Sequence, residues 1–344
     1  MPIGSHIIPR AYLNQFANSP TRKGGEKLIW VYEKGKKPQL RATKRQGAEN
    51  GYFGLVTQDG KLDESLEMRL AELESACLET LELTATRFFD IQSASRRNKL
   101  AFYACMLFNR AEQRRNRGEK THVSLQAQFA DLLNDDKWIA ETAARCVAIR
   151  REVLEPQDLK EIIARAASTL TEPTALRNGF VEQLIGVTEI MKNVALQKPW
   201  QLWRAPGGAE FVTSDNPFVT FVDLGNGRLN SGHGLRKQET IGFFPLSPYV
   251  GLAMGAQGPD TITIGAAHVT NINNVVIELC EKYVYSKNLF ESVRQSVDER
   301  ANTRVYGVNT HLPLGINVPT AKDFVLHVLK LAPWPFPDWL KQSL

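Results

Sequence analysis

The sequence predicts an α+β protein with a large central helical bundle, an N-terminal β-hairpin and a C-terminal antiparallel β region. Helical periodicity over residues 62–198 and short β-like runs on either side of it support this class. With 344 residues, the chain can bury a large core. We expect one compact unit of four segments: an N-terminal motif and basic hairpin (1–60), a helical region (61–198), a β-rich region with helices (199–312) and a Pro/Trp-rich tail (313–344).

The first segment contains the predicted hairpin. Residues 27–33 (KLIWVYE) mix β-branched and aromatic residues, which is typical of a strand. The Lys34-Gly35-Lys36-Lys37-Pro38 sequence is a turn signal, and residues 39–43 can return as the second strand.

The helical region begins with an amphipathic stripe. Its apolar residues recur at steps of three and four: Leu66, Leu70, Leu73, Cys77 and Leu81. Asp63 is a suitable N-cap for this helix. We expect further helices over residues 98–115, 123–134, 136–152, 157–170 and 174–196, with breaks at Pro156 and Pro173.

The β-rich region contains short apolar runs separated by Gly and Asn turns. The predicted strands cover residues 200–203, 211–213, 218–222, 240–244, 250–254, 261–264 and 283–285. Thr270 or Asn271 could cap a helix that runs through Cys280, and another helix should end near Thr303. The tail predicts one short helix and then a proline-rich apolar clasp, or alternatively a peptide that docks on a protein partner.

Composition and local sequence exclude several classes of protein, including membrane-spanning and secreted ones. The formal charge is +5, from 42 Lys and Arg against 37 Asp and Glu, and this excess is too mild to indicate nucleic acid by itself. The four cysteines form no CxxC pair, so we expect buried free thiols in a reducing cytoplasm. No segment reaches the ~18 to 20 apolar residues of a membrane span, and the N-terminus lacks the apolar stretch of a secretory signal.

Four motifs follow one another along the chain. They are His6-x-x-Pro9-x-x-Tyr12-Leu13-x-x-Phe16; residues 28–32 before a basic turn; Glu67 and Glu74 before a helix with Arg110; and residues 211–217 (FVTSDNP), followed by 244–248 (FPLSP), 271–274 and 283–286. In this order they resemble the bacterial family catalogued as domain of unknown function 4238, over roughly residues 5–290. The resemblance implies which positions matter and implies no reaction.

Histidine and acidic side chains are the candidate chemical groups. His6, in a loop fixed by Pro9, could be a general base or acid or a metal ligand, or else a packing histidine. Asp215 and Asn216 precede Pro217, so they could orient a nucleophile, bind a cation or contact a substrate; an Asx-turn is the alternative.

Two glutamates seven residues apart project from nearly the same side of one helix. Glu67 and Glu74 could supply carboxylates to a cation or to a proton transfer, although an acidic solvated face is the simpler interpretation. Arg110 could bind phosphate, or it could form a structural ion pair with either glutamate.

Basic residues concentrate in two stretches, 22–45 and 96–120. Trp30 and Tyr32 are interleaved with the first, and aromatic rings can stack on bases. The two stretches could bind RNA or DNA, or they could be ordinary solubility charges.

These features favour a hydrolase that acts on a polyanion, namely a nuclease-type toxin or antiphage effector. His6, Glu74 and Asp215 would be catalytic, Glu67, Glu74 and Asp215 would hold a divalent cation such as Mg²⁺ or Mn²⁺, and Arg10, Tyr12, Lys44, Arg110 and Asn216 would contact the substrate. The alternative is a non-enzymatic sensor or protein-binding module of a bacterial defence or toxin system.

Overall fold

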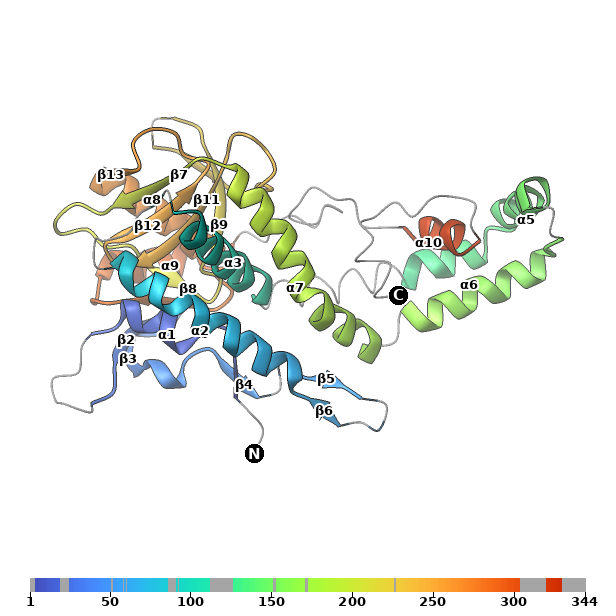
Figure 1. Cartoon of the computed structure of the whole chain (residues 1–344), viewed down its shortest axis with the longest axis horizontal. Coiled ribbons are helices and arrows are strands. Elements are labelled where there is room, and N and C mark those ends of the chain that lie inside the picture. Colours follow the sequence, from blue (N-terminus) through green and yellow to red (C-terminus); the bar gives the residue numbers. More distant parts are fainter. Residues whose placement is uncertain are drawn as a thin grey trace.

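The computed structural model describes residues 4–18, 25–50, 52–57, 59, 61–85, 91, 93–111, 126–150, 153–170, 173–225, 227–303 and 320–329. Two sheets and the helices around them form one body, and α5, α6 and α10 lie apart from the sheets (Figure 1). No helix in these residues is long and apolar enough to cross a membrane.

The larger sheet has six strands in the order β10-β9-β11-β12-β7-β13. Their bounds are β7 Trp200–Arg204, β9 Val219–Asp223, β10 Leu229–Ser231, β11 Thr240–Ser247, β12 Val250–Met254 and β13 Thr261–Thr263. All pairs are antiparallel except β13 with β7, which is parallel. Apolar residues are buried along β11 and β12, because this centre of the sheet is covered on both faces.

The smaller sheet joins two strands from the N-terminal segment to two strands from the β-rich region. Its order is β3-β2-β14-β8, with β2 Leu28–Glu33, β3 Gln39–Ala42, β8 Thr213–Ser214 and β14 Tyr283–Ser286. β2 and β3 form the predicted antiparallel hairpin. β14 pairs with β2 on one side and with β8 on the other, so the hairpin is the outer half of a sheet that C-terminal strands complete.

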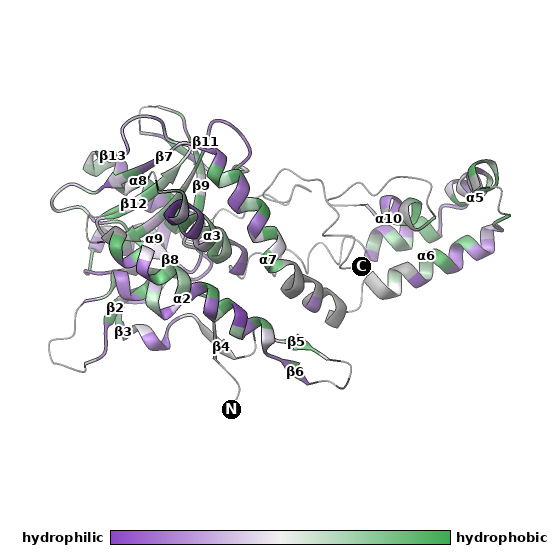
Figure 2. Ribbon diagram, in the orientation of Figure 1, coloured by the Kyte–Doolittle hydropathy of each residue, from purple (hydrophilic) through white to green (hydrophobic). Residues whose placement is uncertain are grey.

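Three long helices pack against these sheets: α2 Ser65–Ala85, α3 Ala94–Arg110 and α7 Pro173–Gln197. Residues 100–111 of α3 are all buried, so this helix is central and not amphipathic. α2 and α7 instead show alternating apolar and polar bands (Figure 2). The stripe predicted on α2 is confirmed, because Leu70, Cys77 and Leu81 are buried in the core.

The remaining helices of the body are short. α1 Arg10–Leu13 and two 3-10 turns, η1 Asn14–Phe16 and η2 Thr43–Arg45, lie in the N-terminal segment. α8 Ala266–Glu278 and α9 Glu291–Arg300 pack against each other and against the strands. Two small antiparallel pairs complete the body: β1 Gly4–His6 with β4 Ala48–Asn50, and β5 Leu55–Val56 with β6 Leu62–Asp63.

A second hydrophobic core is entirely helical. It contains residues of the helical segment 126–133, α5 Asp136–Arg150, α6 Pro156–Leu170 and α10 Ala321–Val328. Leu159, Ile163 and Val325 are almost fully buried in it. α10, the short helix predicted in the tail, therefore packs on this helical lobe; the proline-rich residues after 329 lie outside the described residues.

The fold class is confirmed, with corrections at element boundaries. α3 begins at Ala94, where residue 98 was expected. α8 begins at Ala266, so the cap expected at Thr270 or Asn271 is wrong; the Thr270 hydroxyl donates to the Ala266 carbonyl inside the helix. Asp63 does accept a backbone hydrogen bond from Ser65 at the start of α2. The helices of residues 61–198 contribute to both hydrophobic cores.

Candidate functional site

The Tyr12 hydroxyl connects the opening motif to two segments of the fourth motif, residues 211–217 and 244–248. It shares a hydrogen bond of 2.8 Å with the Thr213 hydroxyl and donates one of 2.7 Å to the Pro245 carbonyl. Its ring stacks on Phe244, with centroids 5.2 Å apart. Pro9 starts α1, and its carbonyl accepts from the Tyr12 N–H, which orients the tyrosine.

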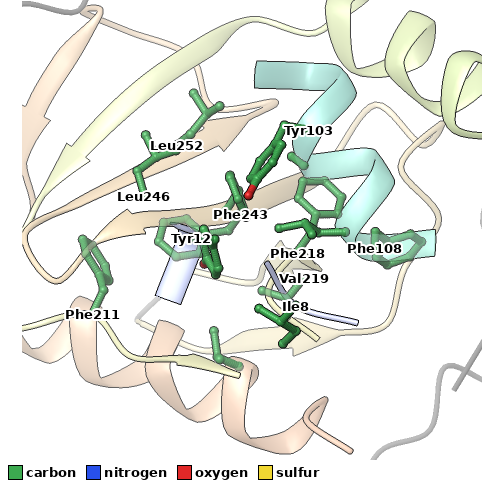
Figure 3. Packing of buried hydrophobic residues seen from close by; sticks show 14 of the residues in the cluster. Ile8, Tyr12, Tyr103, Phe108, Phe211, Phe218, Val219, Phe243, Leu246 and Leu252 are labelled. Carbon is green, nitrogen blue, oxygen red and sulfur yellow. The ribbon is translucent and has the colours of Figure 1, made fainter. Parts of the chain in front are cut away.

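Tyr12 is fully buried (Figure 3). Burial raises the pKa of its phenol, and the hydrogen bond with Thr213 opposes that shift. In this conformation the Tyr12 side chain has no exposed surface and packs inside the core, so its predicted contact with a substrate stays a prediction.

The predicted pairing of Arg110 with a glutamate is present. The Arg110 guanidinium forms an ion pair with Glu74, and only 2% of the arginine side chain is exposed. It also lies over the Phe53 ring, 4.9 Å from its centroid. Glu67 faces the same region, where its carboxylate accepts the Phe53 N–H at 3.1 Å. In this structure Arg110 is buried and its charge is balanced by Glu74, so the predicted substrate contact of Arg110 and the predicted catalytic role of Glu74 stay predictions.

Tyr103 completes this buried cluster. It lies 6.4 Å from Tyr12 between ring centroids, and both tyrosines lie among the packed apolar side chains of Figure 3. Burial raises its pKa well above the ordinary value, and the negative charge of Glu74 adds to that shift. Within the described part of the chain, its hydroxyl has no hydrogen-bond partner.

Asp215 fixes the loop between α8 and β14. Its carboxylate accepts three backbone N–H groups, from Glu281 at 2.8 Å and from Lys282 and Tyr283 at 2.7 Å. Burial raises the pKa of this carboxyl to about 6, against the opposing effect of these hydrogen bonds. Both oxygens are engaged, so the geometry does not fit the predicted catalytic or metal-binding carboxylate.

Two asparagines hold backbone segments together. Asn216 is 1% exposed and donates to the Leu279 carbonyl at 3.0 Å, while its predicted contact with a substrate stays a prediction. Asn273 accepts the Val212 N–H at 3.0 Å and donates to the Glu210 carbonyl at 2.8 Å. These bonds join α8 to the residues 211–217 motif, a role that the sequence analysis did not assign to Asn273.

His6 lies in β1, opposite Ala48 of β4. Its side chain lies outside what the structure describes. The following Ile7 N–H donates to the Gly47 carbonyl at 2.7 Å, which places the backbone of the opening motif beside the residues just after η2. The predicted roles of His6 in catalysis therefore stay predictions.

A basic surface follows the β2–β3 hairpin and η2. Residues 25–45 hold seven basic residues against two acidic ones; the basic residues are Lys27, Lys34, Lys36, Lys37, Arg41, Lys44 and Arg45. Lys36 and Lys44 form ion pairs with Glu33 and Glu26. Exposed Arg10 of α1 adds a charge next to η2, because α1 and η2 are in contact. Arg22 and Lys23 lie outside the described residues.

The second predicted basic stretch, residues 96–120, differs from the hairpin because Arg97 and Arg110 contact other parts of the protein. Arg97 lies over Trp200, 4.7 Å from the ring centroid, and donates to the Leu196 and Lys198 carbonyls. Arg110 is buried, and residues 112–120 lie outside the described part. Arg97 and Arg110 therefore stabilise helix packing.

Metal-ligating residues do not gather in the described structure: no group of three or more His, Cys, Asp or Glu there is placed to hold an ion. All four cysteines are free and buried, as expected from the sequence. Burial raises the pKa of Cys77 to about 11, so this thiol is protonated at neutral pH.

Comparison with known proteins gives one match. The family model described as protein of unknown function (DUF4238) matches residues 5–289. No curated protein and no solved structure matches the chain. The matched range contains Tyr12, Glu74, Arg110, Thr213 and Asp215, which the fold brings into the contacts described above.

Proposed function

The chain belongs to the family of proteins of unknown function DUF4238, and we propose that it binds nucleic acid through the basic surface of its β2–β3 hairpin. The observation that carries this proposal is the positive charge of residues 25–45, most of which lies in the β2–β3 turn and in η2, on either side of the edge strand β3. Neutralisation of phosphates by Lys and Arg supplies most sequence-independent affinity for nucleic acid. The proposal retains the polyanionic ligand predicted from the sequence. It gives Glu67, Glu74 and Asp215 structural roles.

Three cations of this surface are free to meet phosphates. Arg10, Lys37 and Arg45 are exposed. In the described structure, none of the three side chains has a hydrogen bond or an ion pair. Lys37 and Arg45 flank β3, whose four residues extend ~14 Å, a length that corresponds to about four nucleotide steps of a duplex strand.

Fluorescence anisotropy with labelled RNA and DNA, single-stranded and duplex, tests the proposal. We expect the full chain to bind, and the triple variant Arg10→Gln, Lys37→Gln, Arg45→Gln to bind at least tenfold more weakly at moderate salt. The matched control neutralises three basic residues of the helical lobe: Lys137, Arg145 and Lys160.

Equal affinities of the two triple variants would refute the proposal. Basic residues also protect exposed edge strands from pairing with other chains. Under that alternative, the hairpin variant would aggregate more readily while its affinity for nucleic acid stayed unchanged. Light scattering on the same samples separates these outcomes.

Hydrolysis of the bound polyanion is a second candidate function, in which the chain is a nuclease-type toxin or antiphage effector. It is supported by the position of His6 in β1, whose partner β4 begins three residues after Arg45. A histidine beside bound phosphates could act as general base or acid. A divalent cation such as Mg²⁺ or Mn²⁺ would serve this chemistry by activating water.

Two experiments test the hydrolase proposal. Purified chain should cleave RNA or DNA with Mg²⁺ or Mn²⁺, and His6→Ala should not, while both bind the substrate equally. Induced expression in bacteria should slow growth only for the wild type. Equal growth of both strains, with intact nucleic acid in vitro, would favour the sensor or protein-binding alternative. The four free thiols support a reducing, cytoplasmic location for either activity.

A further inference from the structure

A polar pocket opens between the β9–β10 turn and the C-terminal ends of α8 and α9. Its volume is about 470 Å³. It is lined by Gly227, Arg228, Leu229, Asn271, Asn274, Val275, Glu278 and Arg300. None of these residues belongs to the basic hairpin, so this pocket is separate from the proposed nucleic-acid surface.

One face of α8 forms the helical wall. Asn271, Asn274, Val275 and Glu278 follow the spacing i, i+3, i+4, i+7, which places them on one side of a helix. Two neighbouring asparagines of the 271–274 motif have structural hydrogen bonds. Asn273 bonds the backbone of Val212 and Glu210, and Asn271 donates to the Gly227 carbonyl at 2.7 Å. Asn274 has no such role, and its carboxamide makes no hydrogen bond in the described structure.

The opposite wall is the β9–β10 turn, which presents Arg228. Gly227 adopts a left-handed φ of +74°, and a Cβ there would lie 3.1 Å from the Asn271 Nδ2. The Arg228 N–H donates to Gly225, and the Arg228 carbonyl accepts from Leu224, so the backbone of this arginine is fixed. Its side chain is exposed and has no partner in the described residues.

The charges of the pocket leave one cation uncompensated. Arg300 pairs with Glu278 at 3.2 Å, and Glu278 also accepts from the Ser231 hydroxyl at 3.3 Å. This pair neutralises the only carboxylate among the lining residues. Arg300 is the last residue of α9, where the helix dipole favours a cation. Arg228 is thus available to pair with an anionic group from outside the chain.

We propose that this pocket binds a small polar molecule that carries one anionic group, a phosphate or a carboxylate. The Arg228 guanidinium pairs with the anion in a fork geometry, and Asn274 supplies a hydrogen-bond donor and an acceptor beside it. The Glu278–Arg300 pair and Asn271 provide polar walls for hydroxyl or amide groups of the same molecule.

Amide chemical shifts of the ¹⁵N-labelled full chain test this assignment. The probes are inorganic phosphate, acetate and glycerol 3-phosphate, each titrated at constant ionic strength, with chloride as the reference. We expect saturable shifts at residues 227–229 and 274–278, and tighter binding of glycerol 3-phosphate than of inorganic phosphate if the polar walls contribute. A preference for acetate over both phosphates would assign the anionic group as a carboxylate.

Variants locate the binding. Arg228→Gln should raise the dissociation constant at least tenfold, and Asn274→Ala should raise it severalfold. Arg145→Gln, an exposed arginine of α5, is the matched control and should bind as the wild type does. The proposal is overturned if no probe gives saturable shifts at the pocket, or if Arg228→Gln and Arg145→Gln bind equally.

Discussion

Tyr12 and Tyr103 allow the same substitution to be compared at two buried positions. Tyr12→Phe removes a hydroxyl that bonds Thr213 and Pro245. Tyr103→Phe removes a hydroxyl that has no partner in the described structure. Both side chains are fully buried, and their rings are 6.4 Å apart, so burial and local packing are matched.

The two changes should therefore have opposite consequences. A buried group that loses its partner costs about 1–3 kcal/mol. Tyr12→Phe leaves two such groups, the Thr213 hydroxyl and the Pro245 carbonyl, so we expect it to lower the free energy of unfolding by about 2–4 kcal/mol. Tyr103→Phe removes an unsatisfied buried hydroxyl and should be neutral or stabilising by up to ~1 kcal/mol.

Urea denaturation of the full chain measures both differences, from the transition midpoint at unchanged slope. Fluorescence and far-UV circular dichroism should be followed together, because the body and the helical lobe have separate cores. A Tyr12→Phe variant within ~0.5 kcal/mol of the wild type would refute the reasoning. So would equal destabilisation by the two substitutions.

Three further substitutions test other parts of the structure. Gly255→Ala should destabilise by about 3 kcal/mol or more in urea denaturation, because φ is +114° and the new Cβ would lie 2.6 Å from the Thr240 carbonyl oxygen; a loss under ~1 kcal/mol would contradict this. Glu74→Ala should lower the free energy of unfolding by about 3–5 kcal/mol, because it leaves Arg110 buried without its ion partner. Adding Arg110→Met should recover most of that stability. A double variant no more stable than Glu74→Ala would count against the pair. The pKa of Asp215 is about 6, above its ordinary 3.8, so the folded chain binds this proton more tightly than the unfolded chain does. The stability of wild type relative to Asp215→Asn should accordingly increase as pH falls from about 7 to about 4, and a pH-independent difference would refute the shift.

Local sequence patterns predict much of this fold. The stripe from Leu66 to Leu81 predicts the buried face of α2, and the β-branched and aromatic residues of 27–33 predict β2. Pro156 and Pro173 each lie at the first residue of a helix, where a missing N–H costs nothing. These signals act within a few residues, so they can be read without knowledge of distant contacts.

Long-range contacts could not be predicted in this way. β14 completes the sheet of the N-terminal hairpin, although roughly 250 residues separate Tyr32 from its partner Val284. The same limit applies to the candidate site. The sequence allows Arg110 to pair with Glu67 or Glu74 or to bind phosphate, and the burial of its pair with Glu74 follows from packing around α3 that no local pattern encodes.

Asp215 illustrates why chemical type alone misleads. An aspartate before Asn216 and Pro217 fits a catalytic or metal-binding residue and also fits a loop anchor. The choice depends on where the N–H groups of Glu281, Lys282 and Tyr283 point, and these lie more than sixty residues away. Basic residues on the hairpin are different, because both the hairpin and its charges follow from the local sequence.

The dependence of nucleic-acid affinity on salt tests the proposed function most directly. For duplex DNA, the logarithm of the binding constant falls against the logarithm of salt concentration with a slope of about −0.9 per phosphate contact. Loss of Arg10, Lys37 and Arg45 should therefore make the slope shallower by about 2.7, while the Lys137, Arg145 and Lys160 control keeps the wild-type slope. Identical slopes for the wild type and both triple variants would contradict binding through the β2–β3 hairpin.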